Sequence, residues 1–148
     1  MTNPTPTQLP SPSSPLPLGS PFTITDPGFA DEVTVFAVDQ NMAQQAAAPP
    51  SGGHWVGADV QACLKDSRTA FTVSWADWSV SDAGNGQYQA SSDRLPEFPT
   101  PQFPFANEPL AVGECVRGWV AFPVAFGVQI TTVKYKPEGR IPVFWTAG

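Results

Sequence analysis

The sequence has little of what catalysis or metal binding requires. Its 148 residues include one histidine, His54, and two cysteines, and charged residues make up only 14% of the chain. One histidine cannot form a multi-histidine metal site, and we interpret His54, which follows a Gly-Gly turn, as structural or exposed. No glycine-rich phosphate loop follows a strand-like run, so nucleotide binding is not indicated. We therefore predict no cofactor, no metal and no enzymatic activity.

Charge and hydropathy narrow the range of partners further. The chain has 13 acids and 7 bases, which gives a net charge of −6, and this balance argues against binding nucleic acid phosphates or anionic lipid. No apolar run approaches the roughly 18 residues that span a bilayer. The first residues show neither the basic region nor the apolar stretch of a signal peptide. We expect no membrane span and no export leader in the sequence as given.

Carboxylates are the remaining candidates for a metal or acid–base site. The candidates are Asp77, Asp82, Asp93, Glu97 and Glu108, and the run Asp82-Ala83-Gly84-Asn85-Gly86 has the oxygen-rich composition of a calcium loop. It lacks the spacing and the closing glutamate of an EF-hand. We interpret it as the turn of a hairpin.

Proline is concentrated in the first 21 residues of the chain. Residues 1–21 contain seven prolines and no charged residue, a composition that favours an extended, polyproline-like segment without a core of its own. We divide the chain into this arm and a folded domain over residues 22–148. The arm is predicted to dock on a partner, with these contact residues: Pro4, Pro6, Pro10, Pro12, Pro15 and Pro17.

The rest of the chain has the pattern of an all-β domain. Short runs rich in β-branched and aromatic residues alternate with turn signals, and they predict strands over residues 22–25, 32–38, 54–64, 69–75, 77–80, 87–90, 109–112, 114–124, 128–136 and 141–146. The only stretch that favours a helix is Gln40 to Ala48, which Pro49 ends. Strands at this spacing indicate an immunoglobulin-like antiparallel β-sandwich.

The two cysteines lie in the two best-defined strand runs. Cys63 alternates against Val60, Ala62 and Leu64, and Cys115 alternates against Val116 and Val120, so both cysteines fall on the more polar side of their strands. With one pairing available, we predict a Cys63–Cys115 disulfide. Because the shared polar side faces outward, the bridge should join neighbouring strands on one outer face, unless a bulge reverses the parity.

Aromatic residues raise two further possibilities. Trp75 and Trp78, with Trp55, Trp119 and Trp145, offer a platform on which a sugar ring would stack, although the opposite parity of Trp75 and Trp78 favours packing in the core. Residues 95–105 interleave prolines with three phenylalanines. That segment is either a polyproline ligand for an aromatic groove or a rigid crossover anchored on the sandwich, and we favour the crossover.

Residues 22–148 resemble a family of immunoglobulin-like domains found in secreted antigens and lipoproteins of mycobacteria and other actinobacteria. The resemblance rests on Cys63, on a Gly-x-x-x-x-Gly-Trp-Val-x-Phe pattern matched within residues 113–122, and on the ending formed by residues 133–140 and 144–145. The matched pattern residues are Gly113, Gly118, Trp119, Val120 and Phe122. In that family a Pro/Ser/Thr-rich tether precedes a β-sandwich. The resemblance implies no catalytic residues.

These observations favour a non-enzymatic structural or binding module. A disulfide indicates oxidising surroundings, whereas no leader is evident, and a protein released in a phage particle satisfies both. The first hypothesis is therefore a virion component of an actinobacteriophage, such as a capsid decoration or minor capsid or tail protein, attached by its arm to other virion proteins or to a second copy. The alternative is the soluble part of an actinobacterial secreted or lipid-anchored protein, located outside the cell or in its envelope. A carbohydrate-binding module that uses the tryptophans is the weaker alternative.

Overall fold

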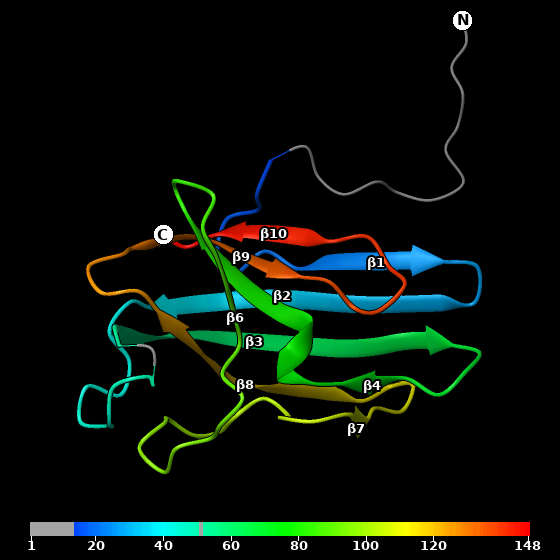
Figure 1. Ribbon diagram of the computed structural model, residues 1–148. Helices are drawn as coiled ribbons and strands as arrows, with labels where there is room; N and C mark the ends of the chain where they lie inside the picture. The colour runs from blue at the N-terminus through cyan, green and yellow to red at the C-terminus, as the bar shows by residue number, and fades with distance from the viewer. Residues whose placement is uncertain (1–13, 51) are drawn as a thin grey trace, which may run out of the picture.

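Figure 1 shows a computed structural model of the chain, in which residues 14–50 and 52–148 are described. This part of the chain forms ten strands and one short 3₁₀ helix, η1. In chain order the elements are β1 (Phe22–Asp26), β2 (Phe29–Asp39), β3 (His54–Ser67), β4 (Thr72–Val73), η1 (Trp75–Asp77), β5 (Trp78–Asp82), β6 (Gln87–Gln89), β7 (Glu108–Pro109), β8 (Cys115–Val124), β9 (Ile130–Tyr135) and β10 (Val143–Thr146). No helix in the described ranges is long and apolar enough to cross a membrane.

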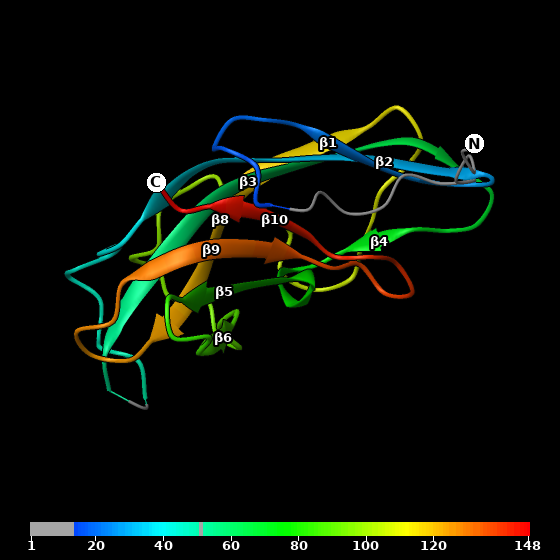
Figure 2. The ribbon, with the colours of Figure 1, turned by 90° about the horizontal axis from the view of Figure 1, so that it is seen from above.

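The strands form two facing sheets, which confirms the predicted sandwich. One sheet has the order β1-β2-β3-β8 and the other the order β10-β9-β5-β6, with all pairings between these strands antiparallel. Figure 2 shows the two layers edge on. A separate two-stranded ladder joins β4 to β7. Each sheet turns one face toward the other, and the alternating apolar residues of the strands fill the space between them.

The alternation read from the sequence places the core correctly. Val60, Val120, Phe122 and Val35 are fully buried. Val116, which has the same strand parity as Val120 and Phe122, is half-buried. It pairs with Ala62, next to the Cys63–Cys115 pair at the end of the β3–β8 ladder.

The helix predicted over residues 40–48 is wrong, because these residues form a loop. Ala43 has a φ of 54°, which lies outside the right-handed helical region. The N–H of Met42 donates to the carbonyl of Trp55 at 2.9 Å instead of to a carbonyl of its own segment. Tertiary contacts therefore override the helical preference of the alanines.

The strand predicted over residues 69–75 is reduced to β4, and η1 occupies the chain from Trp75 onward. Ser74 caps η1, since its hydroxyl oxygen accepts from the N–H of Ala76 at 3.2 Å while the Asp77 carboxylate accepts from the N–H of Ser74 at 3.3 Å. This reciprocal capping box satisfies donors that a helix end leaves free. It also turns the chain so that β5 begins at Trp78.

The proline- and phenylalanine-rich segment is a crossover packed on the sandwich, as favoured from the sequence. Phe98 and Phe103 are buried, and the backbone of Trp119 in β8 donates to Pro101 and accepts from Phe103 at 3.0 and 3.1 Å. A Cβ at Gly118 would collide with the backbone of Gln102 and Phe103. Gly118 therefore permits this close approach.

The tryptophans do not form the exposed platform that sugar stacking would need. Four of them, Trp55, Trp75, Trp78 and Trp145, are no more than 5% exposed. Trp78 contacts the rings of Phe103, Tyr135 and Trp145. These four rings are buried because their large apolar area is worth more in the protein interior than in water. Their burial contradicts the hypothesis that they form a platform for a sugar ring.

Candidate functional site

Two loops meet at one end of the sandwich and form the first candidate site. Residues 40–53 join β2 to β3, and residues 125–129 join β8 to β9 (Figure 1). They lie together because β3 and β8 pair with His54 opposite Val124, so that β3 begins where β8 ends. We call residues 40–41, 53–54 and 126–129 the loop end.

The side chain of Gln40 holds the two loops together. Its Nε2 donates to the carbonyl of Ile130 at 2.9 Å, and its Oε1 accepts from the N–H of Ile130 at 3.0 Å. The amide thus pairs with Ile130 as a neighbouring strand residue would. Because Gln40 is part-buried and Ile130 is buried, these bonds are stronger than they would be in open water.

A second set of bonds anchors the long loop to the core. The N–H of Met42 donates to Trp55, and the indole N–H of Trp55 donates back to the carbonyl of Ala47 at 2.8 Å. Met42 is 3% exposed. The loop end is therefore a built surface, in which the buried Met42 and Trp55 position the residues that face solvent.

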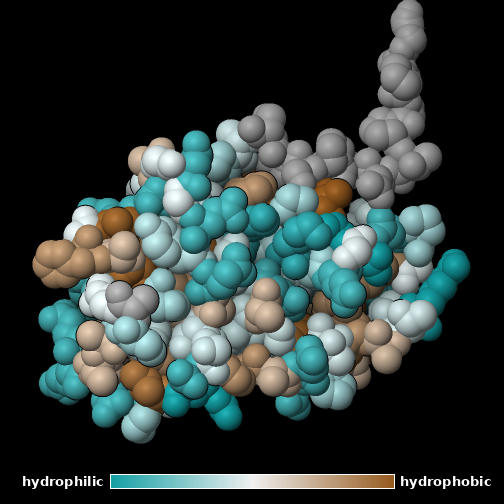
Figure 3. All heavy atoms as spheres, in the orientation of Figure 1, coloured by the Kyte–Doolittle hydropathy of each residue, from teal (hydrophilic) through white to brown (hydrophobic). Residues whose placement is uncertain are grey.

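A hollow of about 370 Å³ lies between the two loops, lined by residues of the loop end. The described residues that line it include no acid, lysine or arginine. Phe126 stands at its rim and is 88% exposed. Figure 3 shows hydrophobic atoms at the edge where the β8–β9 loop projects. The exposed ring beside a hollow that contains amide groups makes the loop end a candidate contact surface.

The other end of the sandwich holds a cluster of ionisable residues, which we call the acid end: Asp31, Asp77, Tyr135 and Arg140. Asp31 is fully buried, and its Oδ2 accepts from the hydroxyl of Tyr135 at 2.7 Å. Burial raises the pKa of Asp31 from 3.8 to about 6, against the lowering effect of the Tyr135 hydrogen bond. Burial also raises the pKa of Tyr135 well above its usual 10.

Asp77 and Arg140 complete the acid end. Burial raises the pKa of Asp77 to about 6, and the N–H of Ser74 opposes that rise. The guanidinium of Arg140 pairs with Asp26 at 3.0 Å and lies 3.8 Å from the ring centre of Phe29. Within the described residues, Asp31 Oδ1 and Arg140 Nε are buried without a hydrogen-bond partner.

The two carboxylates with raised pKa values at the acid end, Asp31 and Asp77, do not face a common hollow. A hollow of about 270 Å³ there is lined by Asp77, Glu138 and Arg140, whereas Asp31 lies outside its lining. General acid–base catalysis needs both groups within hydrogen-bond reach of the substrate. We therefore interpret the raised pKa values as a consequence of burial that affects stability rather than as the sign of a reaction.

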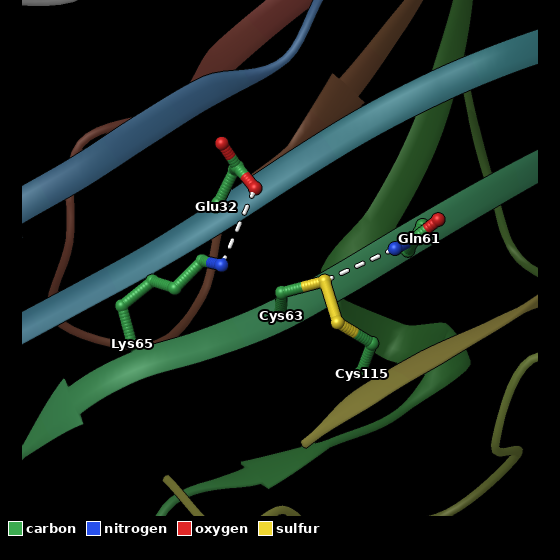
Figure 4. The surroundings of a disulfide bond; sticks show 5 residues. All are labelled: Glu32, Gln61, Cys63, Lys65 and Cys115. Atoms are coloured by element: carbon green, nitrogen blue, oxygen red, sulfur yellow. Dashed lines mark hydrogen bonds and ion pairs between the residues drawn. A yellow bond between two sulfur atoms is a disulfide. The ribbon is translucent and has the colours of Figure 1, made fainter. Parts of the chain in front are cut away.

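The predicted disulfide is confirmed and lies on the outer face of the β3–β8 pair (Figure 4). Cys63 and Cys115 stand directly opposite each other, with their Cα atoms 4.0 Å apart. The N–H of Leu64 donates to Glu114 at 3.0 Å, which makes the cysteines the closer, non-hydrogen-bonded pair of the ladder. On the same outer face Arg117 pairs with Asp59 at 3.0 Å. The bridge therefore joins two strands of one sheet, unlike the inter-sheet bridge of antibody domains.

The Asp82 run is a hairpin turn, as interpreted from the sequence. Oδ1 of Asp82 accepts from the N–H groups of Gly84 and Gly86 at 2.8 and 2.9 Å, and Oδ2 accepts from the hydroxyl of Tyr88 at 3.0 Å. These bonds, that of Gly86 foremost, lower the pKa of Asp82. In the described ranges no group of three or more histidine, cysteine or acidic residues is placed to hold a metal ion.

Only some of the predicted partner-binding prolines lie within the described residues. Pro4, Pro6, Pro10 and Pro12 lie outside the described residues, whereas Pro15 and Pro17 are described and exposed. The leucines beside them, Leu16 and Leu18, are half-buried against the core. The role of the prolines toward a partner stays a prediction.

Asp31 at the acid end and Gln40 at the loop end were not predicted from the sequence as functional residues. Asp31 shares its strand parity with Phe29, Val33 and Val35, so an acid on the buried side of β2 was a readable signal. Gln40 bonds a residue 90 positions away. No local pattern marks such a contact.

No protein-family model and no curated protein sequence matches the chain. Among solved structures, the fold is similar to the crystal structure of MPT63, a secreted protein from Mycobacterium tuberculosis. The two share 18% sequence identity, and the alignment covers 91% of this chain and 99% of that one with a TM-score of 0.67. This likeness shows that the chain has the β-sandwich fold of MPT63.

Proposed function

We propose that the chain is an exported, non-enzymatic binding module that contacts its partner through the loop end. The observation that carries the proposal is the disulfide. It lies in a fold shared with a secreted protein, and stable disulfides persist in oxidising surroundings. Cys115 is exposed, so a reducing cytosol would reach this bridge.

The same observations favour an exported protein over the virion component predicted first from the sequence. The similar fold belongs to a secreted protein, and the disulfide suits either location. The virion hypothesis was based on the lack of an evident leader and on the docking arm, whose prolines through Pro12 lie outside the described residues. The secreted or envelope protein therefore becomes the leading proposal, with the virion as its rival.

The loop end is the part of the surface best suited to a partner. Its loops are anchored by Gln40 and Met42, so a partner meets a preformed surface and loses little affinity to ordering. The hollow lacks acids, lysines and arginines among its described lining residues, which favours a partner recognised by hydrogen bonds and apolar contact. The exposed ring of Phe126 supplies the apolar contact.

Fractionation of the producing culture with thiol trapping tests the location. Free thiols are alkylated before lysis, and the protein is then quantified by mass in the cytosol, the envelope, the cleared medium and the sedimented particles. We expect it in the medium or the envelope, with Cys63 and Cys115 protected as a disulfide. Protein confined to the cytosol with both thiols alkylated would contradict the proposal, and protein that sediments with particles would establish the virion role instead.

A further inference from the structure

One residue of the proline-rich segment, Leu16, pairs with the edge of the second sheet through an isolated β-bridge. Leu16 forms a parallel bridge with Trp145 in β10, the edge strand of its sheet. The N–H of Leu16 donates to Phe144 at 2.9 Å, and its carbonyl accepts from the N–H of Thr146 at 2.8 Å. One residue thus satisfies a donor and an acceptor on the edge of β10.

A turn then fixes the segment to the opposite sheet. The N–H of Ser20 donates to the carbonyl of Pro17 at 3.2 Å and closes a four-residue turn. Gly19, the third residue of this turn, has a φ of 88°, a backbone conformation that favours glycine. The N–H of Gly19 donates to Val35 in β2 at 2.7 Å. The indole N–H of Trp145 donates to the carbonyl of Ser20 at 2.8 Å. Figure 2 shows the segment passing from β1 to β10 between the sheets.

The order of prolines and leucines suits this position. Leu16 and Leu18 are half-buried against the core, whereas Pro15 and Pro17 are exposed. Backbone groups alternate in direction along a strand, so the bonds of Leu16 face β10 and the proline nitrogens, which have no hydrogen, face outward. The carbonyl of Pro17 is already used by Ser20. The segment therefore fills the edge of β10 without creating a new edge that would recruit another strand.

We propose that the edge of β10 is a strand-addition site for an extended peptide of Pro-Leu-Pro-Leu type, and that residues 14–20 are its built-in, exchangeable occupant. The recognition elements are backbone bonds to Phe144 and Thr146 and the apolar surface that receives the two leucines. Strand addition of this kind draws affinity from the main chain and specificity from alternate side chains. A partner that presents the same proline–leucine pattern would compete with the chain's own segment.

The test uses the full chain with its own segment weakened. In the double variant Leu16→Pro/Leu18→Ser, residue 16 has no N–H to donate and both leucine side chains are lost. Amide hydrogen exchange reports the state of the edge, because the N–H of Thr146 bonds to Leu16 whereas that of Ala147 bonds to Thr131 in β9. We expect exchange at Thr146 to accelerate at least tenfold and exchange at Ala147 to stay unchanged.

A labelled peptide of residues 14–21 is then added to both proteins, and binding is followed by fluorescence anisotropy. We expect the double variant to bind it and regain protection at Thr146, while the wild type, whose site is filled, binds at least tenfold more weakly. A control peptide with Leu16→Pro should bind at least tenfold more weakly than the parent peptide. A variant with accelerated Thr146 exchange that does not bind the peptide would overturn the proposal. So would unchanged Thr146 exchange, because the leucines would then not hold the segment.

Discussion

The acid end and the loop end of the sandwich bury polar groups of different kinds. At the acid end Asp31 is buried as an ionisable group, and its pKa is raised to about 6. At the loop end the neutral amide of Gln40 is part-buried and pairs with both backbone groups of Ile130. A buried acid makes stability depend on pH, whereas a paired amide does not titrate. The difference indicates that the acid end matters for stability and that the loop end is available for contact.

The largest expected change in stability comes from removing the disulfide between β3 and β8. The disulfide joins residues 52 positions apart, and replacing both cysteines by serine should lower the free energy of unfolding by about 4 kcal/mol in the chain-entropy model. Urea unfolding of the oxidised wild type and of the Cys63→Ser/Cys115→Ser variant measures this loss. A difference below about 1 kcal/mol would show that the ladder is held by packing alone.

The next effect is the pH dependence that Asp31 imposes. Its pKa of about 6 in the folded state lies above the usual 3.8, so the folded state retains the proton more tightly. The contribution of Asp31 is fully present below about pH 4 and is lost as the pH rises through about 6. A shift of this size corresponds to about 3 kcal/mol.

The Asp31→Asn variant isolates this contribution. It should match the wild type in stability near pH 4 and exceed it by up to about 3 kcal/mol at pH 7.5, since the amide carries no charge to bury. Urea unfolding of both proteins across this pH range is the measurement. A variant that is less stable than the wild type at pH 7.5 would mean that the ionised carboxylate is favourably held by Tyr135.

A smaller loss of stability is expected when the two hydrogen bonds between the Gln40 side chain and Ile130 are removed; we call these bonds the Gln40 clamp. Gln40→Ala removes two hydrogen bonds to Ile130 and should cost about 1 to 3 kcal/mol, with no change between pH 4 and pH 7.5. The matched control is Gln129→Ala, because Gln129 is exposed on the same end and its loss should stay within about 0.5 kcal/mol. Equal losses in the two variants would refute the role of the clamp.

The smallest effect on stability is expected at Phe126. Because the ring is 88% exposed, Phe126→Ser should change the free energy of unfolding by no more than about 0.5 kcal/mol. Thermal or urea unfolding provides the check. A larger loss would show that the ring packs on its own domain, and the loop end would then lose its main argument as a contact surface.

The strands and the disulfide could be predicted because their signals are local. Alternation in residues 114–124 marks β8, and the parity of Cys63 and Cys115 sets the face of the bridge. The loop at 40–48 was mistaken for a helix because its alanines favour one locally, whereas its conformation depends on bonds to distant strands. The Gln40 clamp has no local signal for the same reason. Asp31 was predictable from its buried parity, but its partner Tyr135 lies 104 positions away.

The central claim is that the loop end, and not the acid end, meets the partner. Phe126 and Val112 are the exposed large hydrophobic residues of the described chain, and Val112 lies in the turn before β8, at the opposite end from Phe126. The most direct measurement is co-sedimentation of labelled wild type, Phe126→Ser and Val112→Ser with cell-envelope material from an actinobacterium. We expect Phe126→Ser to lose at least tenfold in retention while Val112→Ser is retained like the wild type. Equal retention of all three proteins, or a loss confined to Val112→Ser, would contradict the account.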